Sequence, residues 1–223
     1  MTGSAGPQRA PHPVRAGRDA PDGPASLPRL LVLTDRRQAV GHLVDVVAAA
    51  VDAGARAVVL REKDLPDDDR RALLAQLAPV VHSAGGLLLS AGTHIPGADG
   101  VHQPSDAGPP PAGVGITGRS CHDAAQMRAA EADGVDYVTV SPIHATVSKP
   151  GYGPSLGAEG LARLAASTTL PVYALGGIDG AAAVTACRAA GAHGVAVMGA
   201  IMRAARPGPL AAHLLAAAEV DRP

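Results

Sequence analysis

Short apolar runs alternate with alanine-rich segments along the chain from about residue 28 onward. The runs are hydrophobic on consecutive residues rather than on every second residue, which is typical of strands covered on both faces of a parallel sheet. Polar or glycine residues close each run. Eight runs are expected to form strands, at residues 30–35, 57–64, 86–91, 100–104, 113–120, 136–142, 171–177 and 194–200.

The segments between the runs are rich in Ala and Leu and repeat apolar residues at three- and four-residue steps, as amphipathic helices do. Asp67 and Asp179 stand at two helix starts, as N-cap or first-turn acids. The connections after the third and fourth runs are short and rich in Pro and Gly, so we expect one helical turn in them or none. Helices are expected at residues 38–53, 67–84, 122–133, 158–168, 179–190 and 207–219.

Eight strand-then-helix units predict an α/β fold, a single (β/α)8 TIM barrel of minimal size. An open doubly wound sheet is the alternative, but it needs a strand suited to an edge, and none of the runs is of that kind. Residues 1–27 are rich in Pro, Gly and charge and have no apolar centre. We therefore expect a disordered tail at 1–27 and a barrel domain at 28–223.

The composition narrows the classes of partner. The 19 Lys and Arg balance 20 Asp and Glu, and the chain has three Tyr but no Phe or Trp, which argues against a nucleic-acid surface. No apolar run approaches the roughly 20 residues that cross a bilayer. Cys121 and Cys187 have no metal or redox spacing and suit a reducing compartment. We expect a cytoplasmic protein with a small-molecule substrate and no membrane partner; a homo-oligomer formed through the outer helices stays open.

The residues that end the strands are the candidates for chemistry, because barrels of this kind work at that face. Gly176 and Gly177 end the seventh run, and Met198 and Gly199 end the eighth. Glycine lets the backbone approach an anion closely, so these two loops are expected to bind phosphate. An alternative is that glycine merely ends strands in a glycine-rich protein.

Arg61 and Lys63 end the second run two residues apart, so in a strand they face the same way. Two cations at the barrel mouth indicate a second anion contact, and a solvated charge cluster is the alternative. The sixth run leads into a loop at 142–154 with hydroxyls, a lysine and Gly-Pro hinges. This composition suits a loop that covers substrate, or else a plain exposed connection.

Four histidines fall at or just after strand ends: His94, His102, His122 and His144. They lack the HxH, HxxxH or Cys partners of a zinc site, so no metal is expected. His122 follows Ser120 by two residues at a helix start, where a neutral imidazole can transfer protons near neutral pH. Packing or capping is the alternative role for a lone histidine.

Seven linked motifs lie within about residues 29–202: TDR (34–36), LREKD (60–64), ADGVHQP (98–104), GRSCH (118–122), DYVTVSPIHATVSKPGYGP (136–154), PVYALGGI (171–178) and GVAVMGAI (194–201). Together they resemble the thiamine phosphate synthase/TenI superfamily. The superfamily has two activities. Thiamine phosphate synthase joins hydroxymethylpyrimidine diphosphate to thiazole phosphate with Mg²⁺ and releases pyrophosphate, whereas TenI-type tautomerases aromatise a thiazole phosphate carboxylate by moving a proton.

The chain departs from the synthase pattern at the Gln of its pyrimidine-binding motif and at its Mg²⁺ ligands. Val59 replaces the Gln of the Q-L-R-E-K motif, and the Asn-Asp pair after the third strand is Ser90-Ala91. The other Mg²⁺ ligand of the synthases is the Asp of a G-V-H-L-G-Q-x-D segment, and the matching Asp106 comes one residue earlier than this segment places it. Because Mg²⁺ prefers carboxylate oxygens, these departures favour the TenI type.

The resemblance also implies the site residues of the TenI type. Thr146, Ser148 and Lys149 match its T-x-T-K segment, and Ser120 and His122 match its S-x-H segment, which holds the catalytic histidine. We therefore expect a thiazole tautomerase without a cofactor, with His122 as general acid and base. The alternatives are a thiamine phosphate synthase that recruits Mg²⁺ through Asp106 or another carboxylate, and a non-catalytic homologue that binds thiazole or thiamine phosphate.

Overall fold

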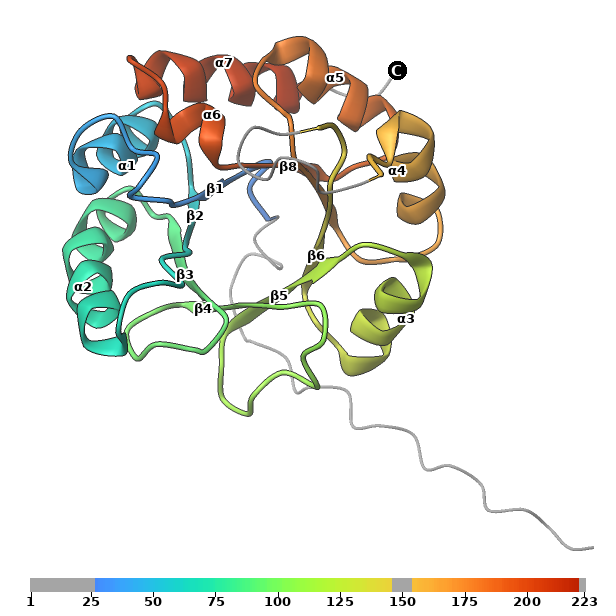
Figure 1. The fold of residues 1–223 in the computed structure, drawn as a ribbon, viewed down its shortest axis with the longest axis horizontal. Coiled ribbons are helices and arrows are strands. Elements are labelled where there is room, and N and C mark those ends of the chain that lie inside the picture. The colour runs from blue at the N-terminus through green and yellow to red at the C-terminus, as the bar shows by residue number, and fades with distance from the viewer. Residues whose placement is uncertain (1–26, 146–153, 221–223) are drawn as a thin grey trace, which may run out of the picture.

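A computed structural model describes residues 27–145 and 154–220. Eight parallel strands close into a barrel in sequence order, and β1 pairs with β8 to complete the ring (Figure 1). The predicted (β/α)8 barrel is confirmed, and every expected strand is present. The strands are β1 (Leu30–Leu33), β2 (Ala57–Leu60), β3 (Leu87–Ala91), β4 (Gly100–Gln103), β5 (Ile116–Cys121), β6 (Tyr137–Val140), β7 (Val172–Leu175) and β8 (Gly194–Val197).

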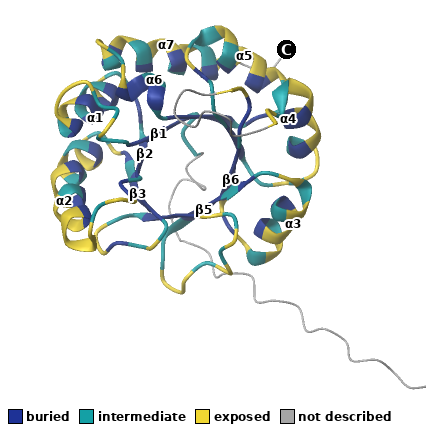
Figure 2. Cartoon of the chain, viewed as in Figure 1, coloured by how far each residue is buried: buried dark blue, intermediate teal, exposed yellow. Residues whose placement is uncertain are grey.

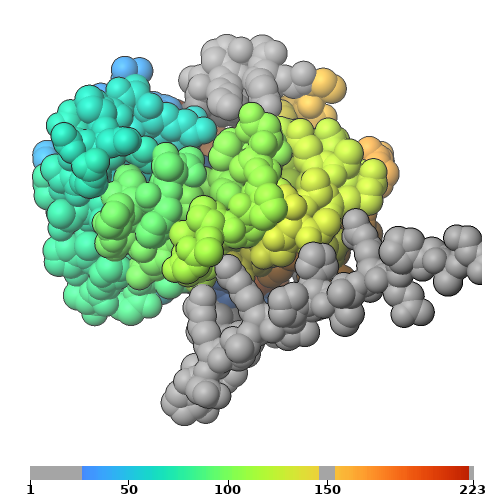
Figure 3. All heavy atoms as spheres, turned by 90° about the horizontal axis from the view of Figure 1, so that it is seen from below, coloured from blue at the N-terminus to red at the C-terminus, as the bar shows by residue number. Residues whose placement is uncertain are grey.

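Helices surround the barrel at the six expected places, and one further short helix, α6, follows β8 directly. Within the described ranges no helix separates β3 from β4 or β4 from β5, as the Pro and Gly content of these connections predicts. Figure 3 shows this side of the molecule, where the loops around β4 and β5, in green, lie between α2 and α3. The helices are α1 (Leu43–Asp52), α2 (Asp67–Ser83), α3 (Ala124–Asp133), α4 (Gly157–Ala165), α5 (Ala181–Ala189), α6 (Gly199–Met202) and α7 (Pro207–Glu219).

One of the two acids predicted to cap or begin a helix does so. Asp67 lies in the first turn of α2, as expected. The expectation for Asp179 is wrong, because Gly180 is the N-cap residue and α5 begins one residue later. Among the described helices, an acid caps α3: the carboxylate of Asp123 accepts a hydrogen bond from the backbone N–H of Gln126 at 2.9 Å.

The chain has two separate apolar cores. The larger lies between the strands and the helices, and the smaller fills the barrel interior with residues such as Leu31, Val59 and Leu89. Strands are therefore buried on both faces while the outer helix faces remain exposed (Figure 2). This double burial is the physical reason for the consecutive apolar residues in each run.

Aromatic rings occupy the centre of the barrel. Tyr137 and Tyr173 meet edge to face with ring centroids 5.3 Å apart, and His102 stacks on Tyr137 at 5.6 Å. Gly118 makes room for them, because a Cβ there would lie 2.0 Å from Cζ of Tyr137. Two of the three tyrosines of the chain thus fill the space that a barrel interior must pack.

The N-terminal end of the barrel is closed by the first described residues. The Tyr173 hydroxyl donates to the carbonyl oxygen of Pro28 at 2.5 Å, and the Arg29 guanidinium donates to the carbonyl oxygen of His193 at 2.8 Å. Side chains therefore seal this end, and the opposite end, where the strands terminate, is left for a site.

Candidate functional site

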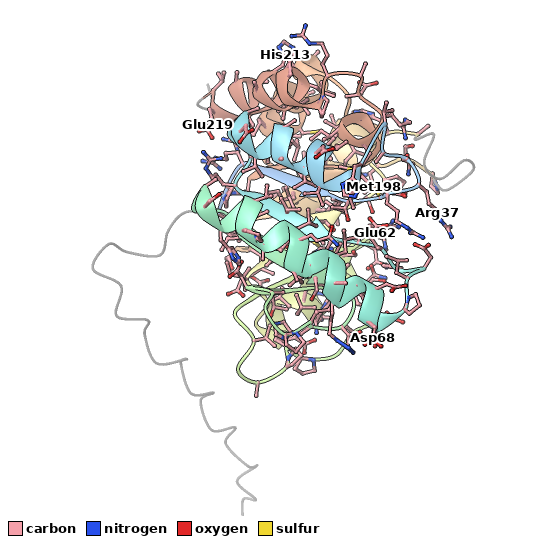
Figure 4. The ribbon with its side chains drawn as sticks, turned by 90° about the vertical axis from the view of Figure 1, so that its left-hand side faces the viewer. Arg37, Glu62, Asp68, Met198, His213 and Glu219 are labelled. Carbon is pink, nitrogen blue, oxygen red and sulfur yellow. The ribbon has the colours of Figure 1, made fainter. Side chains whose placement is uncertain are left out.

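A cavity of about 210 Å³ lies at the C-terminal end of the barrel. Its walls come from the ends of β1, β2, β6, β7 and β8, so residues far apart in the sequence meet there. Figure 4 shows Glu62 and Met198 at this end of the barrel, and Glu219, the last residue of α7, at the other. Five of the predicted site residues line the cavity: Arg61, Gly176, Gly177, Met198 and Gly199.

The loop after β7 requires glycine. Gly176 and Gly177 have φ of 106° and 67°, in the left-handed region that side chains disfavour. A Cβ on Gly177 would also lie 2.6 Å from Cβ of His144. The backbone N–H of His144 donates to the carbonyl oxygen of Gly176 at 3.1 Å. The start of the loop after β6 therefore packs directly on this glycine pair, which leaves bare backbone at the cavity wall.

The wall formed by β8 continues into α6. Met198, Gly199 and Ala200 line the cavity, and the exposed Arg203 at the end of α6 lines it as well. The Arg203 side chain donates a hydrogen bond to Oε1 of Gln38. Arg203 was not predicted, because a four-residue helix is too short to show a period, although its position four residues after Gly199 was a usable signal.

Two further polar residues of the cavity wall were not predicted as site residues. Ser141 follows β6, and Asp179 follows the glycine pair of the β7 loop. Asp179 was predicted only as an acid at a helix start.

The end of β2 holds Arg61 on the inner side of the barrel. Its backbone N–H donates to Oγ1 of the buried Thr34 at 2.9 Å, which fixes the strand end. Glu62 points the other way, as the alternation predicts: its carboxylate accepts hydrogen bonds from the backbone N–H of Arg36 at 3.1 Å and from the Arg36 guanidinium at 3.2 Å. Lys63 is exposed in the following turn and is not among the lining residues, so only one of the two predicted cations is in the cavity wall.

Arg36 also organises the outer rim of this strand end. Its guanidinium contacts the carboxylate of Asp64 at 2.7 Å, and Arg37 reaches the same carboxylate at 2.9 Å. The hydrogen bond from Arg36 holds the pKa of Asp64 below its ordinary value. Asp64 and Glu62 are therefore committed to arginines rather than to the cavity.

Ser120 lies half-buried on β5, facing the barrel interior. Its Oγ is 3.0 Å from Nε2 of His102, whose Nδ1 is 3.1 Å from the hydroxyl of Tyr137. Burial lowers the pKa of His102 to about 4, and the charges of Lys63 and Arg61 act in the same direction. The imidazole is therefore neutral at physiological pH.

His122 is held against the end of β6. Its Nδ1 is 2.7 Å from the carbonyl oxygen of Ser141, and its backbone N–H donates to the Gln126 side chain at 2.8 Å. His122 is not among the cavity-lining residues. Thr146, Ser148 and Lys149 lie outside the described residues, so their roles stay predictions.

The donors at the mouth do not fit a magnesium site of the synthase pattern. Ala91 offers no ligand, and the Ser90 hydroxyl is engaged, donating to the carbonyl oxygen of Thr93 at 2.9 Å and accepting from the N–H of Ile95 at 3.1 Å. Asp106 is exposed in the β4–β5 connection. Across residues 27–145 and 154–220, no three His, Cys, Asp or Glu side chains gather to hold an ion.

The two cysteines have no part in the site. Both are buried free thiols, and burial raises the pKa of each to about 11, which disfavours the reactive thiolate. Among the described helices, none has the length and apolar character needed to cross a membrane.

A protein-family model described as thiamine monophosphate synthase matches residues 30–201. The chain belongs to this family. A putative thiamine-phosphate synthase of Geobacter sulfurreducens is 39% identical over 199 residues, covering 84% of this chain and 92% of that protein. A thiamine-phosphate synthase of a Roseiflexus species is 38% identical over 190 residues, covering 79% of each. Family membership confirms the superfamily resemblance.

Solved structures agree with the family assignment. A thiamine phosphate pyrophosphorylase from Pyrococcus furiosus superposes with a TM-score of 0.75 at 26% identity, covering 86% of this chain and 95% of that one. Other barrels, such as a geranylgeranylglyceryl phosphate synthase from Thermoplasma acidophilum at 12% identity, share the fold alone.

The expected tautomerase, an isomerase, is wrong. The relatives are named as thiamine-phosphate synthases, which are transferases. The expectation rested on the missing carboxylates at Ser90-Ala91 and on the S-x-H segment of Ser120 and His122. Loss of metal donors removes one way to neutralise a leaving group, but it does not create a proton-transfer site. The proton-transfer role of His122 is tied to the tautomerase and is not carried further.

Proposed function

We propose that the chain is a thiamine-phosphate synthase, joining hydroxymethylpyrimidine diphosphate to thiazole phosphate and releasing pyrophosphate. Membership in the family and the names of the relatives support this reaction. The observation that carries it is the cavity whose wall combines the bare backbone of the β7 and β8 loops with the Arg61 side chain at the end of β2. One wall then suits the phosphate of the thiazole and the other suits the diphosphate.

The phosphate of the thiazole is assigned to the wall formed by Gly176, Gly177 and Gly199. Glycine permits close approach of backbone N–H groups to phosphate oxygens, and the packing of the glycine pair against His144 fixes the loop in advance. Thr146, Ser148 and Lys149, which follow His144 in the sequence, belong to the same proposed subsite.

The diphosphate is assigned to the side of the cavity that Arg61 lines, with Lys63 adding positive charge from the turn that follows β2. In the reaction, the thiazole nitrogen forms a bond to the methylene carbon of the pyrimidine while the bond from that carbon to the diphosphate oxygen breaks. The electron pair leaves with pyrophosphate. Guanidinium groups donate paired hydrogen bonds to such oxygens and stabilise the charge that develops on them.

No protein-held metal is assigned to this reaction. The donor set at Ser90-Ala91 and the exposed Asp106 do not fit one, so the proposal gives the neutralising role to the cations of the chain itself. The expectation of no resident cofactor is therefore part of the proposal.

The test supplies purified protein with both substrates and follows pyrophosphate release and thiamine phosphate formation together. Equal amounts of the two products are expected. Arg61→Gln is expected to slow the reaction, whereas Arg128→Gln, an exposed change on α3, serves as the matched control. Absence of both products would overturn the proposal.

A second candidate is a non-catalytic protein that binds thiazole phosphate or thiamine phosphate. The replacement of the family's Asn-Asp pair by Ser90-Ala91 favours it. Saturable binding of thiazole phosphate in the same preparation, with no pyrophosphate released from the substrate pair, is the result that selects this candidate.

A further inference from the structure

A buried polar chain crosses the barrel interior from β6 through β4 to β5. The Tyr137 hydroxyl is 3.1 Å from Nδ1 of His102, and Nε2 of His102 is 3.0 Å from Oγ of Ser120. Tyr137 is 2% exposed and His102 is 7% exposed, and their rings stack at 24°. Thr139 offers a second, longer contact to Nε2 at 3.4 Å. Three strands thus contribute one connected set of hydrogen bonds.

The direction of these hydrogen bonds follows from counting protons. A neutral imidazole has one N–H and one lone pair, so one ring nitrogen donates and the other accepts. Among the described residues, His102 is the hydrogen-bond partner of the Tyr137 hydroxyl. If Nδ1 carried the proton, the Tyr137 O–H would be buried without an acceptor, which is costly. Tyr137 therefore donates to Nδ1, and Nε2–H donates to Ser120.

This polarity determines what Ser120 can offer. The Ser120 oxygen accepts a hydrogen bond from Nε2–H of His102. The Ser120 O–H is therefore left to donate a hydrogen bond to another group. Ser120 is half-buried on the interior face of β5. Its hydrogen-bond partner His102 lies within the electrostatic influence of Lys63 and Arg61, whose positive charges favour an anion at this end of the barrel. An anionic oxygen accepts such a hydrogen bond, whereas a cationic or donor group does not.

We propose that Tyr137 and His102 are positioning residues that set the Ser120 hydroxyl as a hydrogen-bond donor to the diphosphate of the substrate. This inference rests on the proposed function. Neither residue touches substrate: Tyr137 fixes the tautomer of His102, and His102 fixes the direction of the Ser120 O–H. This direction of the hydrogen bonds from Tyr137 through His102 to Ser120 requires no metal, and it requires no change in the protonation of His102 between pH 5 and 8.

The primary test is Tyr137→Phe, which keeps the ring and removes the hydroxyl. Without that donor the imidazole can place its proton on Nδ1, and Ser120 then donates to Nε2 instead of to substrate. We expect the affinity for inorganic pyrophosphate, measured by calorimetry, to fall about 10-fold, with a parallel fall in kcat/KM. The control is Tyr173→Phe, whose hydroxyl bonds Pro28 at the closed end and whose loss is expected to leave both quantities unchanged.

A double-mutant cycle separates positioning from structural damage. In a Ser120→Ala background, Tyr137→Phe should cause no further loss, because the group that it orients is gone. An undiminished loss in that background, or equal losses from Tyr137→Phe and Tyr173→Phe, would overturn the inference. Because pyrophosphate binding is measured without turnover, the cycle is informative even if the protein makes no thiamine phosphate, so failure of the proposed function is distinguishable.

A measurement on the unaltered protein covers the case in which a variant fails to fold. Nitrogen-15 NMR of labelled histidine distinguishes the two neutral tautomers. His102 is expected as the Nε2–H tautomer at pH 5 to 8, and the Nδ1–H tautomer would overturn the inference.

Discussion

The guanidinium of Arg70 donates a hydrogen bond to the carbonyl oxygen of Ala91 at 2.6 Å. This contact links the first turns of α2 to the C-terminal end of β3, where the synthase pattern has a metal-binding carboxylate and this chain has a methyl group. Ala91 is 4% exposed and belongs to the barrel interior. The strand end is therefore held in place by a buried arginine while its side chain offers no charge to a ligand.

Restoring the Asn and Asp of the synthase pattern at the end of β3 tests whether their replacement has removed a Mg²⁺ site. The double variant Ser90→Asn, Ala91→Asp is expected to gain saturable Mg²⁺ binding in calorimetry, while the unaltered protein titrated with Mg²⁺ alone shows none. Ala91→Asn, which matches the shape without the charge, is the control. Equal Mg²⁺ binding by the unaltered protein and the double variant would contradict the prediction.

Arg61→Gln is expected to reduce kcat/KM for the pyrimidine diphosphate roughly 10- to 100-fold, because a charge-assisted hydrogen bond to the diphosphate is lost. Steady-state kinetics with thiazole phosphate held saturating measures this. The apparent affinity for thiazole phosphate should stay within about twofold. If thiazole phosphate binding fell by as much as diphosphate binding, the division of the cavity into two subsites would be wrong.

Gly177→Ala is expected to lower the free energy of unfolding by about 1–3 kcal/mol and to weaken thiazole phosphate binding. The added Cβ is disfavoured at φ 67° and would lie 2.6 Å from Cβ of His144, so the loop must move. Urea unfolding and calorimetry measure the two effects. Gly108→Ala is the control, since nothing lies within 4 Å of a Cβ there. A stable Gly177→Ala protein with normal phosphate binding would show that the loop is not fixed by this packing.

The buried His102 makes stability depend on pH. Its pKa in the fold is about 4, below the ordinary 6.5, so between these values the unfolded chain binds a proton that the folded chain does not. Stability therefore falls as the pH drops through this window, by about 2 kcal/mol between pH 7 and pH 5 from this group. Urea unfolding at both pH values should show a smaller loss in His102→Gln. If the unaltered protein and His102→Gln lost the same free energy of unfolding, folding would not lower the pKa of His102.

The barrel was predictable because each strand is covered twice, which leaves consecutive apolar residues in the sequence. The opposed sides of Arg61 and Glu62 followed from strand alternation, and the glycine loops followed from their order along the chain. The link between His102 and Ser120 was not predictable, because it depends on the register of β4 on β5 and of β5 on β6, where Gly118 faces both His102 and Tyr137. The activity was mistaken because both activities of the superfamily share most of its motifs, and the choice depended on two residues.

The rings of Tyr137 and Tyr173, together with Pro28, fill the barrel toward its N-terminal end, and this has a consequence for turnover. With one end of the barrel blocked, both products of the proposed reaction must depart by the opening through which the reactants arrived. Pyrophosphate that stays bound beside Arg61 would block the next pyrimidine diphosphate. Product release, rather than bond formation, is therefore expected to limit the rate.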